Sequence, residues 1–140
     1  MIDFQISEYN AFVISSTILC IGIFIDSLNV IFKRHLYSIK TGIFPLKFQR
    51  NYRSSRVLNS IYDLRPNLFT YNNFIFLMIV RALIALIITL NLSNHFIFYI
   101  LLFLLQLIFN IRNIFTLSGA DQMQNIILFG LVIYSLNISP

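Results

Sequence analysis

Four apolar stretches, separated by one long mixed segment and two shorter polar links, set the pattern of this chain. They run from Ala11 to Phe32, from Phe74 to Leu92, from Phe96 to about Ile111, and from Met123 to about Ile138. A helix of about 20 apolar residues crosses the hydrocarbon core of a bilayer, which is about 30 Å thick. The pattern therefore predicts one all-α integral membrane domain over residues 1–140, built as a bundle of four transmembrane helices.

The mixed segment 33–73 lies between the first two predicted helices. Its first part alternates apolar residues with Lys40 and Lys47 around a turn at residues 42–45. Ser54 then precedes a stretch whose apolar positions fall on one helical face, before Pro66 ends it. We expect an amphipathic segment at the membrane interface, and a connector packed against the bundle core is the alternative.

Two charges lie inside predicted membrane helices, Asp26 in the first and Arg81 in the second. Such charges are costly in hydrocarbon, so each needs a partner, a water-filled cavity or a path to the surface. Helices joined by one loop run antiparallel, and both residues lie about seven positions from the same loop, so they share a depth. We expect an ion pair between them. Snorkelling of Arg81 to the interface and pairing with another chain remain the alternatives.

A polar stretch leads into the fourth predicted helix and contains Ser118, Asp121 and Gln122. Ser118 followed by Asp121 fits a helix start, because serine caps the first N–H groups and a carboxylate favours the positive end of the helix dipole. The candidate polar binding site inside the membrane therefore comprises Asp26, Arg81, Asp121 and Gln122.

No residue is assigned a catalytic role. His35 and His95 have no further ligands at metal spacing, so we expect no metal and no cofactor.

Composition supports a membrane location and explains the basic charge. The apolar fraction is 58%, and only 11% of residues are charged, against about 25% in soluble domains. The net charge of +5 comes mainly from the segment between Lys33 and Arg65, which suits an anionic lipid surface better than nucleic acid. By the positive-inside rule, this segment is cytoplasmic or faces the matrix, and both termini lie on the other side. The expected lipid-contacting residues are Lys33, Arg34, Lys40, Lys47, Arg50, Arg53 and Arg56.

Four sequence features together resemble the amino-terminal half of the HTTM (horizontally transferred transmembrane) domain family. This family includes vitamin K-dependent gamma-carboxylases and sporulation-delaying protein B-like proteins. The features are residues 22–26 followed by Lys33-Arg34, the stretch YSIKTGIFP at 37–45, SIYDL at 60–64, and Arg112-Asn113 followed by Gly119-Ala120-Asp121-Gln122.

The resemblance implies a multi-helix membrane protein that works with partner proteins or a peptide substrate, in the processing or export of a peptide. No carboxylase base aligns with a residue of this chain, so we do not expect an autonomous enzyme. Two alternatives remain: an accessory or structural subunit of a large bacterial or organellar membrane complex, and a fragment of a vitamin K-type carboxylase-like enzyme. Frequent Ile, Asn and Phe indicate an AT-rich genome, so we expect the bacterial inner membrane or, alternatively, the mitochondrial inner membrane.

Overall fold

The computed structural model describes residues 2–37, 60, 70–92, 95–112 and 119–138. These residues form four α-helices and one short 3-10 helix, and the described part of the chain contains no strand. The elements are α1 (Ile2–Phe32), η1 (Arg34–Tyr37), α4 (Tyr71–Thr89), α5 (Phe96–Arg112) and α6 (Gly119–Ile138). The prediction of an all-helical fold is confirmed for the described residues.

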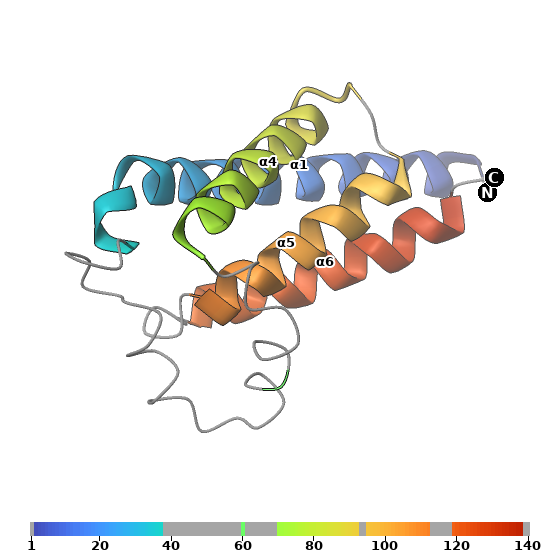
Figure 1. Cartoon of the computed structure of the whole chain (residues 1–140). Helices are drawn as coiled ribbons and strands as arrows, with labels where there is room; N and C mark the ends of the chain where they lie inside the picture. Colours follow the sequence, from blue (N-terminus) through green and yellow to red (C-terminus); the bar gives the residue numbers. More distant parts are fainter. Residues whose placement is uncertain (1, 38–59, 61–69, 93–94, 113–118, 139–140) are drawn as a thin grey trace.

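The helices pack as a bundle in which α1 and α4 cross on one side and α5 and α6 lie together on the other (Figure 1). The beginning of α1 and the end of α6 lie at the same end of the bundle. At that end the rings of Phe12 and Tyr134 approach with their centroids 4.7 Å apart. The opposite end carries the end of α1 and the beginnings of α4 and α6.

Each helix turns one face inward because its buried positions recur every three or four residues. On α4 the fully buried residues are Phe74, Met78, Arg81, Ala85 and Ile88. The same spacing recurs in α1, α5 and α6, and it is the spacing that lets nearly parallel helices interlock their side chains. The buried faces of the other helices comprise Phe12, Ser16, Cys20, Ile23, Ser27 and Val30 on α1, Tyr99, Leu102, Gln106 and Phe109 on α5, and Leu128, Leu131 and Ser135 on α6.

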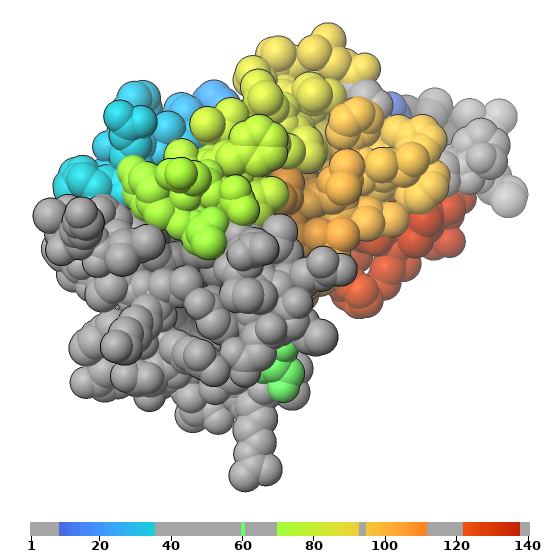
Figure 2. All heavy atoms as spheres, viewed as in Figure 1, coloured from blue at the N-terminus to red at the C-terminus, as the bar shows by residue number. Residues whose placement is uncertain are grey.

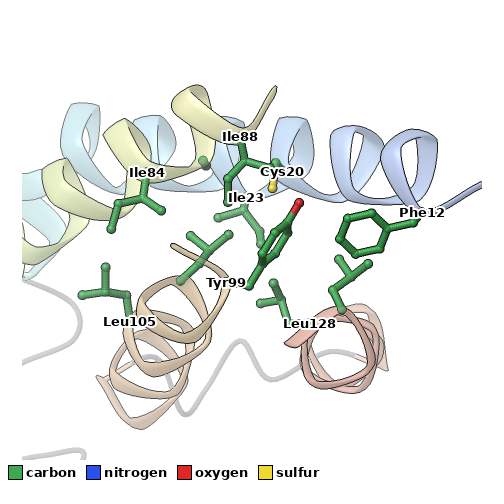
Figure 3. Packing of buried hydrophobic residues seen from close by; sticks show 11 residues of the cluster. Phe12, Cys20, Ile23, Ile84, Ile88, Tyr99, Leu105 and Leu128 are labelled. Carbon is green, nitrogen blue, oxygen red and sulfur yellow. The ribbon is translucent and has the colours of Figure 1, made fainter. Parts of the chain in front are cut away.

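One half of the interior is apolar. Figure 3 shows Tyr99 of α5 between Phe12 and Cys20 of α1, with Leu128 of α6 beside it. The rings of Phe12 and Tyr99 lie 5.5 Å apart between centroids, tilted against each other. This cluster packs residues of all four helices together.

The helix boundaries differ from the predicted ones by local chain chemistry. The first helix begins at Ile2 rather than at Ala11. The second ends at Thr89 rather than at Leu92 because Asn91 adopts a left-handed conformation, with φ 52°. The N–H groups of Asn91 and Leu92 donate to the carbonyls of Ile88 and Ile87, which is the Schellman arrangement that ends helices.

Two helices are long and apolar enough to cross a membrane, in the segments Tyr9–Phe32 and Tyr71–Thr89. The apolar stretch Phe96–Ile111 of α5 is shorter, and α6, which begins at Gly119 as the polar stretch indicated, carries several amide side chains in its first turns. Four membrane crossings therefore stay a prediction. The predicted interfacial helix after Ser54 lies outside the described residues, as does Ser118 with its predicted capping role.

Candidate functional site

Arg81 is the largest of the fully buried side chains in the described structure, with 0% of its surface exposed. It stands in the middle of the inward face of α4, four residues before Ala85 and three after Met78. The spacing of this face places a guanidinium, rather than an apolar side chain, at the centre of the bundle. Burying such a charge is unfavourable by several kcal/mol unless its N–H groups find acceptors.

The neighbouring helices supply acceptors for both Nη groups. The Nη1 group of Arg81 donates to the hydroxyl of Ser27 on α1, at 3.1 Å, and its Nη2 group donates to the side-chain carbonyl of Gln106 on α5. The guanidinium carbon also lies 4.5 Å from the centroid of the Phe109 ring. A cation held over an aromatic face away from water gains roughly 2 kcal/mol.

From Arg81 a chain of hydrogen bonds runs through two amides to a carboxylate. Gln106 Nε2 donates to Gln124 Oε1 at 3.2 Å, and Gln124 Nε2 donates to Asp26 Oδ2 at 3.2 Å. Each amide accepts on the side of the positive charge and donates toward the negative one. The two amide dipoles are thus aligned between Arg81 and Asp26, and hydrogen bonds aligned in this way strengthen one another. The network joins all four helices.

A branch of the network ties α5 to α6. Gln106 Nε2 also contacts Asn110 Oδ1 at 3.4 Å, and Asn110 Nδ2 donates to Asn125 Oδ1 at 3.0 Å. Gln106 and Asn110 are four residues apart, so one face of α5 presents both. The branch gives Gln106 three described partners, which makes this amide the centre of the network.

The structure brings Asp26 and Arg81 into one network but not into a direct ion pair. The depth predicted for both residues agrees with their joint contacts, whereas the predicted pairing is not among the contacts of these described residues. The reason is the rotation of the helix. Successive residues of an α-helix are about 100° apart, so Ser27, which is fully buried, faces Arg81 while the half-buried Asp26 turns toward α6.

Of the two predicted site residues on α6, Gln122 is exposed, and the side chain of Asp121 lies outside the described part. The residue of this helix that enters the network is Gln124. Sequence reasoning missed Ser27, Gln106, Asn110, Gln124 and Asn125 as site residues. The available signal was the isolated pair Gln106 and Asn110 within an otherwise apolar helix.

Among the predicted lipid-contacting residues, Lys33 and Arg34 lie where α1 ends and η1 begins, and both are exposed. Lys40, Lys47, Arg50, Arg53 and Arg56 lie outside the described residues. His95 is an exposed residue before α5, where its Nδ1 accepts from the N–H of Ile97 at 3.4 Å. Within the described residues, no three His, Cys, Asp or Glu side chains lie together as a metal site requires.

The outer surface of the bundle is rich in large apolar side chains. Those on α4 and α5, the helices that face the viewer in Figure 2, include Phe76, Leu83, Leu101 and Leu104. On α1, Ile18 is 66% exposed and Ile25 is 52% exposed. The molecule thus exposes many isoleucine, leucine and phenylalanine side chains, while its interior holds an arginine, amides and serines beside the apolar core.

No family model, curated protein or solved structure matches this chain. The resemblance to the HTTM family therefore stays a prediction from the sequence.

Proposed function

We propose that this chain is an integral membrane protein whose four helices all cross the bilayer, and that it works with partner membrane proteins in the processing or export of a peptide. The polar network from Arg81 to Asp26 fixes the helices around an internal polar site. The bilayer is the bacterial inner membrane, with the mitochondrial inner membrane as the alternative.

The observation that carries the membrane assignment is the large number of apolar side chains exposed on the outer surface of the helices. A soluble protein seldom exposes contiguous apolar surface without a partner. A core helix of a soluble protein is also mostly buried, whereas only 28% of the apolar window in α1 and 39% of that in α4 are buried here. Inside a membrane, by contrast, buried hydrogen-bonded polar side chains are the usual means of joining helices.

Peptide processing or export comes from the sequence resemblance to the HTTM family. The second candidate, an accessory subunit of a large membrane complex, is favoured by the outer face of α1. Ser15 and Asn29 are exposed there among isoleucines, and polar residues on an outward face suit a contact with neighbouring protein better than one with lipid tails.

Alkaline carbonate extraction of membranes that contain the chain tests the membrane assignment. The chain should remain in the membrane pellet and be released by detergent. Its release by carbonate together with peripheral proteins would contradict the proposal.

A comparison of cells with and without the chain separates the two functions. Loss of a mature secreted peptide, with all membrane complexes unchanged on native gels, supports peptide processing or export. Loss of one large complex with an unchanged set of secreted peptides supports the accessory subunit.

A further inference from the structure

We infer that Asp26 is the docking point for a basic side chain on the membrane helix of a partner protein. The inference rests on the proposed membrane location and adds to it the chemistry of the partner. The observation behind it is a carboxylate at the outer edge of the polar network, where α1 meets α6.

The carboxylate is held from one side only. Asp26 is half-buried, and its Oδ2 atom accepts the hydrogen bond from Gln124. Among the described residues, its Oδ1 atom accepts no hydrogen bond. Arg81, the cation at the other end of the network, is separated from Asp26 by two amides. The negative charge therefore has no cation in direct contact within the described structure.

The surroundings of Asp26 leave it open to another helix. Gly22, one turn earlier on α1, is half-buried, and the nearest atom to a side chain built there is Gln124 Nε2 at 4.0 Å. Ile25 and Asn29, on either side of Asp26, are exposed. Gly22 thus lies beside α6, whereas Ile25 and Asn29 share with Asp26 a helical face that is open to a second helix.

The depth of Asp26 selects the partner's chemistry. Asp26 lies six residues before Phe32, the last residue of α1, which places it roughly 9 Å inside the apolar segment. Lipid tails offer no hydrogen-bond donor at this depth. A lysine or arginine on a neighbouring membrane helix offers both a donor and the opposite charge, and such pairs are strongest where water is excluded. Charge complementarity thus favours a basic membrane helix over lipid alone.

The test uses the full chain in lipid nanodiscs and synthetic membrane peptides as probes. Three 22-residue Leu/Ala helices serve as peptides. One carries a single Lys a quarter of the way along, and the second carries it at the centre. The third has Leu in place of the Lys. Binding is measured by energy transfer between labelled peptide and labelled protein. Polar contacts between membrane helices predict roughly 3- to 30-fold tighter binding of the quarter-position Lys peptide than of the Leu peptide.

Two variants on α1 complete the design. Asp26→Asn retains an acceptor for Gln124 but removes the charge, and it should abolish the preference for the Lys peptide. Ile18→Ala, at an exposed position of α1 about two turns before Asp26, should retain it. Equal binding of the Lys and Leu peptides, or a preference that persists in Asp26→Asn, overturns the inference. The chain is incorporated into the nanodiscs before the peptides are added. Such a result therefore contradicts the docking of a basic helix at Asp26 and does not contradict the proposed membrane location.

Discussion

Replacing Gln106 with leucine tests the central amide of the network most sharply. Gln106 is fully buried and has three described partners, Arg81, Gln124 and Asn110. A hydrogen bond to a charged group contributes roughly 1.5 to 3 kcal/mol, and one between neutral groups in a membrane protein about 0.6 kcal/mol. Gln106→Leu should therefore lower the free energy of unfolding by about 3 kcal/mol, because it removes an acceptor from a buried guanidinium.

The assay is reversible unfolding in mild detergent or bicelles, with Gln122→Leu as the matched control. Gln122 is an exposed glutamine at the start of α6, so its replacement should change stability by less than about 0.5 kcal/mol. A double-mutant cycle with Arg81→Leu isolates the contact. The losses of unfolding free energy in the two single variants should add up to about 1.5 to 3 kcal/mol more than the loss in the double variant, since each single change already removes the hydrogen bond between Arg81 and Gln106. Equal effects of Gln106→Leu and Gln122→Leu would refute the network.

Three further substitutions test other parts of the structure, each measured as a change in the free energy of unfolding. Asp26→Asn should lower the free energy of unfolding by less than about 1.5 kcal/mol, because the asparagine still accepts the hydrogen bond from Gln124. A decrease as large as that of Gln106→Leu would contradict this. Asn91→Val should destabilise the chain by roughly 1 to 2 kcal/mol while Asn91→Gly should be neutral or stabilising, since φ is 52° at this position. Leu102→Ala should cost about 2 to 5 kcal/mol by opening a cavity, whereas Leu101→Ala, at a 42% exposed position, should cost far less.

Much of the fold follows from the pattern of apolar stretches. The third helix begins at Phe96 as predicted, and the other helices include most of the predicted residues. The sequence also indicated that Asp26 and Arg81 share a depth, because both were counted from the same loop. These features depend on the position of residues along a helix axis, and an apolar stretch with its polar ends defines that position well.

The rotation of each helix could not be predicted in the same way. In a membrane helix nearly every position is apolar, so the outward and inward faces carry almost the same residue types and the contrast that orients a soluble helix is weak. As a result, the sequence predicts that Asp26 faces Arg81, whereas in the structure its neighbour Ser27 does. Gln106 and Gln124 belong to the site because the packing of α5 and α6 places them between the two charges.

Spin labels on the outer face of the bundle, in a bilayer, show whether that face lies in lipid. Labels at Ile18→Cys and Leu83→Cys, which replace side chains 66% and 55% exposed, are compared for collisions with oxygen and with a water-soluble nickel complex. Our account predicts frequent oxygen collisions and few nickel collisions, as expected for side chains in lipid tails. Nickel collisions at the level of a label in water would contradict it.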